Sequence, residues 1–282
     1  MPNTSEMTVW AQDAYSYDII PRSSSLTVFR RLDFRRVNCK NIFVLTSATD
    51  LPVVAEFVRS ANTLNHLRTL FIREDGHAQL LPQLLYETKL RMSRHILVHS
   101  DLDVPRRVLM AWSLGCPDRL IANARVFNNE LFAIACDHTL FRVRFEEMPA
   151  LERIPIEQRS SFTISSEGSY IHWLEPDVHI DLDAIRYVED ESWRLKKDRE
   201  RIIYDVRFGA AVATVRNMYA LKQTDIQGLS ERQVRRIEKG GRTKVDTLAI
   251  LAKSHGLSLK NYLDEIAESL RTIKIEEPVQ GV

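Results

Sequence analysis

Residues 230–241 read SERQVRRIEKGG, and this stretch decides the fold of the C-terminal part of the chain. Ser230 and Gln233 have the spacing of a capping box, in which each side chain satisfies a backbone N–H at the start of a helix. The helix that they open covers residues 231–238, and Gly240 and Gly241 end it. The sequence therefore predicts a short, strongly charged helix with defined ends.

The residues around this helix continue the helical pattern. A first helix precedes it and contains Arg216, and a second helix begins at Leu221. After the charged helix, a fourth helix covers residues 245–255, and a fifth begins at Leu257. This predicts a charged connector helix followed by an all-α domain of five helices, together covering residues 191–274, and then a tail over residues 275–282.

This ordered set of residues resembles the Cro and phage-repressor type of helix-turn-helix, the xenobiotic-response-element-like regulators. The residues that carry the resemblance, in about a fifth of the chain, are Arg216, Leu221-x-Gln223, Gly228-Leu229-Ser230, Ile237-Glu238-Lys239-Gly240, Leu248, Leu251-Ala252 and Gly256-Leu257-Ser258-Leu259. The chain has fewer residues between the second helix and the turn than this family usually has. The second helix is therefore expected to be about one turn shorter.

The chemistry of the charged helix agrees with the resemblance, because a helix in the major groove brings its N-terminal side chains to the base edges. We predict that bases are read by Glu231, Arg232, Gln233 and Arg236. The DNA backbone is expected to be contacted by Lys222, Gln223, Thr224, Arg235, Lys239, Arg242, Thr243 and Lys244. The alternative for Arg235 and Arg236 is a solvated helix face. The resemblance also implies a partly buried ion pair between Arg216 and Glu238.

The charge of the chain divides between its parts. The formal net charge is only +1. Residues 194–274, however, contain 18 Lys and Arg against 10 Asp and Glu, a net charge of +8, and the rest of the chain, with 21 against 28, has −7. A basic module favours a polyanionic partner.

Residues 39–124 predict an α/β domain with a short parallel sheet. Apolar runs at residues 42–45, 69–72 and 96–98 alternate with helical patterns, and residues 120–122 are the candidate for a fourth strand. The sequence Thr46-Ser47-Ala48-Thr49 follows the first strand, where ligands bind in open sheets, but no glycine-rich phosphate loop is present. Residues 1–38 are predicted to be a partly ordered arm.

Residues 125–190 have the period-two pattern of a small antiparallel β domain, with hairpins over 131–145 and 162–173. The segment resembles a small uncharacterised bacterial domain that occurs beside toxin–antitoxin components. The resemblance rests on Asp137-His138-Thr139, Phe162, Ile171-His172-Trp173 and residues 177–181. His172, Glu175, Asp177 and His179 could hold a metal ion, with Asp181 and Asp183 on the same strand face as Asp177 and His179. The exposed polar face of an edge strand is the preferred interpretation.

The whole sequence thus predicts a multidomain fold: α/β, small antiparallel β, and a five-helix helix-turn-helix domain. We expect a bacterial, cytoplasmic, sequence-specific transcriptional regulator that binds double-stranded DNA as a homodimer. The N-terminal domains would serve dimerisation, or bind a protein partner or small effector. We expect no enzyme activity, cofactor, metal ion or membrane segment, and the three widely spaced cysteines favour a reducing compartment. The alternatives are an antitoxin-like or adaptor protein, in which the helical module serves autoregulation, and an enzyme built on the α/β segment.

Overall fold

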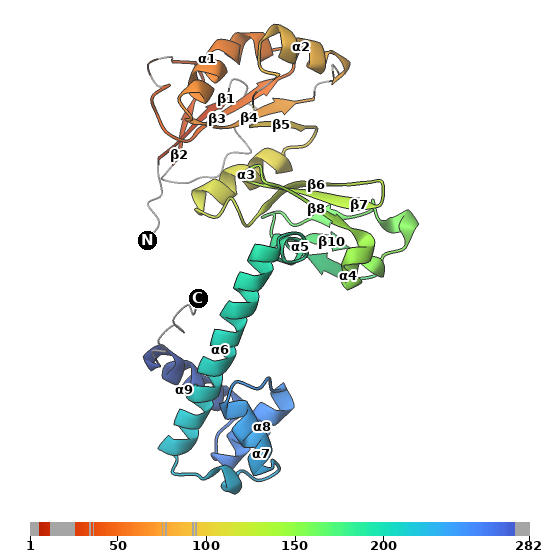
Figure 1. Cartoon of the computed structure of the whole chain (residues 1–282). Helices are drawn as coiled ribbons and strands as arrows, with labels where there is room; N and C mark the ends of the chain where they lie inside the picture. Colours follow the sequence, from red (N-terminus) through yellow and green to blue (C-terminus); the bar gives the residue numbers. More distant parts are fainter. Residues whose placement is uncertain are drawn as a thin grey trace, which may run out of the picture. The chain divides into compact units, whose positions relative to one another are not determined.

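The computed structural model describes residues 6–11, 26–33, 35, 37–74, 76, 78–91, 93 and 95–273. The chain divides into two compact units, an N-terminal unit, Met1–Asp190, and a C-terminal unit, Glu191–Val282 (Figure 1). The fold combines a parallel sheet, small antiparallel sheets and a group of C-terminal helices. The predicted tail, residues 275–282, lies outside the described residues.

The first part of the N-terminal unit is a five-stranded parallel sheet in the order β2-β1-β3-β4-β5. Its strands are β1 (Met7–Ala11), β2 (Leu26–Phe29), β3 (Ile42–Ser47), β4 (Leu67–Arg73) and β5 (Ile96–His99). Its helices are α1 (Leu51–Thr63), the short 3-10 helix η3 (Ala78–Leu80), α2 (Leu81–Glu87) and α3 (Asp103–Ser113). From β3 to α3, strand and helix alternate as the sequence predicted, and the parallel pairing of the strands confirms the parallel sheet.

Alternate residues of each strand enter two different cores, because successive side chains point to opposite faces of a sheet. Val44 and Ile72 pack in the core that contains the buried residues of α1. Phe43 and Phe71 pack in the core that contains those of α3. Burial on both faces explains why these strands are continuous apolar runs in the sequence.

The structure differs from the predicted arm over residues 1–38. β1 (Met7–Ala11) lies inside the sheet, between β2 and β3, and all five of its residues are buried. The predicted arm also contains β2. Residues 1–5 and 12–25 of this arm lie outside the described residues. A five-residue run is short, and its hydrogen-bond partners in β3 are more than 30 residues away. Local sequence pattern therefore does not reveal it.

The second part of the N-terminal unit contains two antiparallel sheets. One has the order β6-β7-β8 and the other β11-β10-β9. Their strands are β6 (Ile121–Phe127), β7 (Glu130–Ala135), β8 (Leu140–Arg144), β9 (Thr163–Ile164), β10 (Ile171–Trp173) and β11 (Val178–Ile180). The helices are the 3-10 helices η4 (Phe145–Glu147) and η5 (Ile156–Gln158), with α4 (Pro149–Glu152) and α5 (Leu182–Glu189). Both predicted hairpins are confirmed, and Phe145 and Trp173 lie in the shared core.

The predicted fourth parallel strand, residues 120–122, is wrong. β6 begins at Ile121 and pairs antiparallel with β7, so it belongs to the second part of the unit. The turn between them is Asn128-Asn129, and both residues have positive φ angles, 48° and 65°. Asparagine tolerates this conformation, which two-residue hairpin turns with the twist of the strands require. The Asn-Asn pair was the sequence signal that distinguishes a hairpin from a crossover.

The parallel sheet and the β-rich part contact each other within the N-terminal unit. From α3, Arg107 Nε donates to the carbonyl of Ala122 at 3.0 Å, and Trp112 Nε1 donates to the carbonyl of Cys136, also at 3.0 Å. Thr69 Oγ1 and His138 Nε2 are 2.9 Å apart. The boundary that the sequence drew between residues 124 and 125 thus falls within β6, inside one compact unit.

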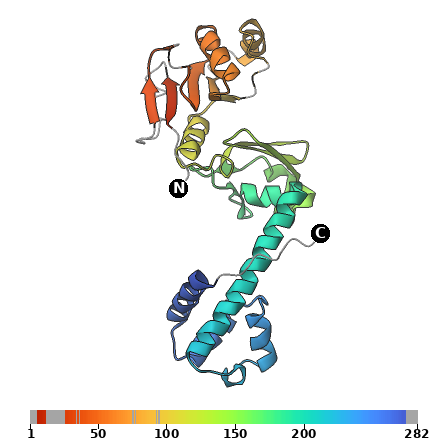
Figure 2. The same ribbon diagram turned by 60° about the vertical axis from the view of Figure 1, so that its left-hand side comes forward.

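The C-terminal unit consists of helices around one apolar core (Figures 1 and 2). They are α6 (Glu191–Met218), the 3-10 helix η6 (Gln223–Asp225), α7 (Glu231–Glu238), α8 (Val245–Ser254) and α9 (Leu259–Thr272). The predicted connector and first helix form the single helix α6. The predicted second helix is reduced to η6, one 3-10 turn, which is shorter than expected. Among the described residues, no helix combines the length and the apolar character needed to cross a membrane.

Candidate nucleic-acid interface

The ends of α7 have the geometry that the sequence predicted. The Ser230 hydroxyl accepts from the Gln233 backbone N–H at 3.3 Å, and the Ser230 backbone N–H donates to Gln233 Oε1 at 2.8 Å. This is the predicted capping box. At the other end, Gly240 has a φ of +87°, and the N–H of Gly241 donates to the carbonyl of Arg236. Only glycine adopts such a φ without strain, so the helix ends there.

α7 has one buried face and one basic exposed face. Val234 and Ile237 are buried in the core of the unit. The opposite face carries the exposed side chains of Arg232, Arg235, Arg236 and Lys239, at the spacing that places them together on a helix. We call these four residues the basic face of α7. In the following loop, Arg242 and Lys244 are exposed as well.

The four predicted base-reading residues differ in how free their side chains are. Gln233 uses Oε1 in the capping box, so it cannot present both its oxygen and its amide nitrogen to adenine without leaving the cap. Glu231 forms an exposed ion pair with Arg235. Arg232 and Arg236 are exposed and form no ion pair with the described residues. Their guanidinium groups are the ones available to a ligand.

The predicted backbone-contacting residues surround α7. Lys222 and Thr224 are exposed beside and within η6. Arg242 lies 3.8 Å from an Asp205 carboxylate oxygen, and Lys244 precedes α8 as its N-cap residue. Thr243 is half-buried, and its hydroxyl has no hydrogen-bond partner among the described residues. The loop after α7 therefore adds exposed cations next to its basic face.

The predicted ion pair between Arg216 and Glu238 is confirmed. Arg216 Nε lies 2.6 Å from Glu238 Oε1, and Nη2 lies 3.2 Å from Oε2, so the pair is bidentate. Only 12% and 7% of the two side chains are exposed. Gln223 Nε2 donates to the same Oε2 at 2.6 Å, which joins η6 to the network. The network connects α6, η6 and the end of α7, and it holds α7 in position.

α6 and α7 approach each other at backbone distance around Gly209. A Cβ atom added at Gly209 would lie 2.5 Å from both the nitrogen of Gly240 and the carbonyl oxygen of Ile237. Only a residue without a side chain permits this contact. Gly209 was not among the residues predicted to matter. Its position was nevertheless a signal in the sequence, because a glycine inside a helical pattern often marks a close approach to another backbone segment.

A cavity of about 220 Å³ lies at the carboxyl ends of β1 and β3 in the N-terminal unit. Its walls include Trp10, Ala11, Leu45, Val54 and Arg31. In the order β2-β1-β3-β4-β5, the chain changes direction across the sheet between β1 and β3, and ligands of open parallel sheets bind at such points. The sequence indicated this sheet edge only through residues 46–49, because β1 lay in the predicted arm.

Comparison with known proteins gives one match. Residues 121–189 match the model of a family described as a protein of unknown function, DUF2442. The matched residues run from β6 to α5, which is the β-rich part of the N-terminal unit. This agrees with the resemblance of the middle segment to an uncharacterised β-rich domain. No curated protein matches the chain, and no solved structure does.

Proposed function

We propose that the protein is a sequence-specific transcriptional regulator, and that its C-terminal unit binds double-stranded DNA through α7. In this proposal α7 is the recognition helix of a Cro-type helix-turn-helix and lies in the major groove. The N-terminal unit serves dimerisation or the binding of a protein partner or small effector. The observation that carries the proposal is the basic face of α7, which lies opposite the buried Val234 and Ile237.

The available side chains on this face have the chemistry that base recognition needs. Arginine binds the O6 and N7 atoms of guanine with two parallel hydrogen bonds, and each such contact contributes about 1–3 kcal/mol of discrimination. Arg232, in the first turn of α7, is the residue that we assign to this contact, with Arg236 one turn later. Gln233 contributes its amide nitrogen only, since its oxygen remains in the capping box.

The surrounding cations suit the DNA backbone. Lys222, Lys239, Arg242 and Lys244 are exposed on both sides of α7, and in this proposal they bind phosphates together with Gln223, Thr224, Arg235 and Thr243. The net charge of +8 on residues 194–274 supports the same partner, because the release of counterions from DNA favours a basic module. Affinity should therefore fall steeply as the salt concentration rises.

A rigid position for α7 also supports the proposal. Base contacts require that a recognition helix keeps one orientation relative to the rest of its domain. Here the Arg216–Glu238 pair, the Gln223 hydrogen bond and the close approach at Gly209 hold α7 against α6 and η6. An ordinary solvated helix face would need none of these constraints. One such module contacts few base pairs, so we expect two copies of the chain on inverted half-sites about one helical turn apart.

The test is to select duplexes from a random pool with the purified full-length protein, and then to measure binding by fluorescence anisotropy. Arg232→Ala should relax base preference at one position by roughly 1–3 kcal/mol. Lys244→Ala should weaken binding to all duplexes alike and reduce the salt dependence. Lys260→Ala on α9 is the matched control, because it removes an exposed lysine away from α7 and should leave the base preference intact. A protein that shows no preference among duplexes at moderate salt would contradict the proposal.

A further inference from the structure

Two histidines face each other across neighbouring strands of the β-rich part. His172 on β10 and His179 on β11 form a directly opposed cross-strand pair. Their neighbours Ile171, Trp173, Val178 and Ile180 are buried, so the histidines lie on the other face of the sheet. Their rings are stacked, with centroids 3.9 Å apart and an angle of 12° between the planes.

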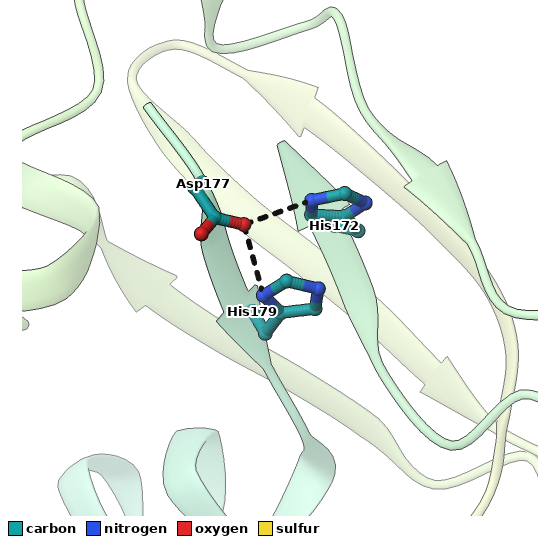
Figure 3. A group of neighbouring side chains, drawn as sticks. All are labelled: His172, Asp177 and His179. Atoms are coloured by element: carbon teal, nitrogen blue, oxygen red, sulfur yellow. Dashed lines mark ion pairs between the residues drawn. The ribbon is translucent and has the colours of Figure 1, made fainter. Parts of the chain in front are cut away.

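Asp177 brings a carboxylate to both rings. Its Oδ1 atom lies 3.5 Å from His172 Nε2 and 3.7 Å from His179 Nδ1, as the dashed lines of Figure 3 show. Asp177 is the last residue of the turn between the strands, and its backbone N–H donates to the carbonyl of Leu174. Glu175, which the sequence placed in the same cluster, is not part of it. Asp181 and Asp183 are not on this strand face either, because Asp181 caps α5 by accepting from the N–H of Ala184, and Asp183 lies in that helix.

The separations between the three donor atoms are those of a metal site. Two ligands bound at about 2.0–2.2 Å to a tetrahedral ion lie roughly 3.3–3.6 Å apart. The two distances from Asp177 Oδ1, 3.5 and 3.7 Å, agree with this range to within about 0.1 Å. The donor atoms all lie within 4.8 Å of one another. Because an imidazole nitrogen donates in the plane of its ring, the two rings must turn out of their stack for both nitrogens to bind one cation.

One of these donor atoms makes no hydrogen bond with the described residues. His172 Nε2 is buried and has no hydrogen-bond partner among the described residues, although the ring is partly exposed at its other edge. A buried nitrogen that makes no hydrogen bond is unfavourable, because nothing compensates for its loss of water. A cation at the ring edges, beside Asp177, would use this nitrogen, the His179 nitrogen and the carboxylate together. The arrangement therefore points to a ligand that accepts three donors at once.

We propose that His172, Asp177 and His179 bind a divalent transition-metal ion of the zinc class. Two imidazoles and one carboxylate are the donor set of such ions, whereas Mg²⁺ and Ca²⁺ prefer oxygen ligands alone. Three protein ligands leave a further coordination position for water or another ligand. The ion joins β10 to the edge strand β11, so its binding stabilises the part of the chain that contains the DUF2442 match. This site is independent of the proposed DNA interface.

The experiment uses full-length protein without an affinity tag, stripped of metal by a chelator and then titrated with Zn²⁺ by calorimetry. We expect one Zn²⁺ per chain. His179→Gln and Asp177→Asn should each weaken binding by more than about tenfold, since even residues that only support a ligand contribute 10–100-fold. Asparagine suits the positive φ of position 177, 59°, so this variant should keep the fold. Glu175→Gln, a neighbouring exposed carboxylate outside the cluster, is the matched control and should bind as the unmodified protein does.

A second readout separates this site from the cysteines. Co²⁺ in place of Zn²⁺ should give a visible spectrum without the thiolate charge-transfer band that a cysteine ligand produces. The absence of Zn²⁺ binding would overturn the proposal. Binding that both substitutions leave unchanged, or a Co²⁺ spectrum with the thiolate band, would overturn it too, because the ion would then lie elsewhere.

Discussion

Replacing Gly209 by alanine should destabilise the C-terminal unit, although alanine favours helices more than glycine does. The substitution would place a Cβ atom 2.5 Å from Gly240 N and Ile237 O and 2.6 Å from Glu238 O. All three are backbone atoms at the end of α7, so no side chain can rotate away. To reach an ordinary contact of 3.4 Å, the two helices would have to separate by about 0.9 Å.

The expected magnitude is the difference between two terms. Alanine in a helix interior is favoured over glycine by about 1 kcal/mol. Forcing an extra carbon into a packed contact costs about 1–3 kcal/mol, and the backbone partners here place the cost at the upper end. The net loss of stability should be about 1–2 kcal/mol. The displacement also moves the basic face of α7, so the affinity for DNA should fall if the proposed function is right.

Amide hydrogen exchange of the full-length protein measures this effect locally, because the opening free energy of α7 is read from its own amides. Gly256→Ala is the matched control. Gly256 differs from Gly209 in having a positive φ, 69°, and nothing lies within 4 Å of the position of its Cβ. It should cost about 1 kcal/mol through backbone strain and leave the contact between α6 and α7 intact. If Gly209→Ala instead slows exchange in α7 by the full helix propensity gain, the argument from close approach is refuted.

Two further perturbations have expected outcomes. Arg216→Met should lower the opening free energy of α7 by about 3 kcal/mol. This is the lower end of the range for a broken buried ion pair, because Gln223 still donates to Glu238. Adding Glu238→Gln should recover part of the loss, and fully additive effects of the two substitutions would contradict the pairing. Burial, with a smaller effect of the nearby His95, lowers the pKa of His138 to about 4. Because the folded pKa lies below the unfolded value of about 6.5, the stability of the N-terminal unit should fall by about 3 kcal/mol as the pH drops from 6.5 to 4. Urea titrations at several pH values give the free energy of unfolding at each pH. In His138→Gln this free energy should depend less on pH, and an unchanged pH dependence would exclude His138 as the cause.

The sequence predicted the features that depend on neighbours in the chain. The capping box of Ser230 and Gln233 and the glycine stop after α7 are local, and both are present as expected. The two hairpins of the β-rich part also follow from alternating residues around short turns. The Arg216–Glu238 pair is different, since it joins residues 22 positions apart, and a resemblance to a known helix-turn-helix indicated it.

The wrong predictions concern elements of two kinds. In one the hydrogen-bond partners are distant in the sequence, and in the other a local turn or capping signal disagrees with the pattern of the surrounding residues. β1 depends on hydrogen bonds to β2 and β3, so its four apolar residues and Thr8, inside a polar stretch, were predicted to be part of an arm. β6 follows a segment in which strands and helices alternate, so its sequence was predicted to be a further parallel strand. The Asn128-Asn129 turn contradicts that prediction. The predicted strand through Asp181 stops at Ile180, because the Asp181 side chain satisfies a helix N-terminus.

The sequence by itself determined the parallel and antiparallel segments, the boundaries of α7 and the separation of charge along the chain, because periodicity, capping and composition act over a few residues. Only the tertiary structure decided which side chains meet. It placed Gly209 against the end of α7, assigned the oxygen of Gln233 to a cap, and left Arg232 and Arg236 exposed. It also brought Asp177 to both histidines of a cross-strand pair while it removed Asp181 and Asp183 from them. These histidine contacts depend on the register of β10 and β11 and on where α5 starts. Packing of the whole unit sets both.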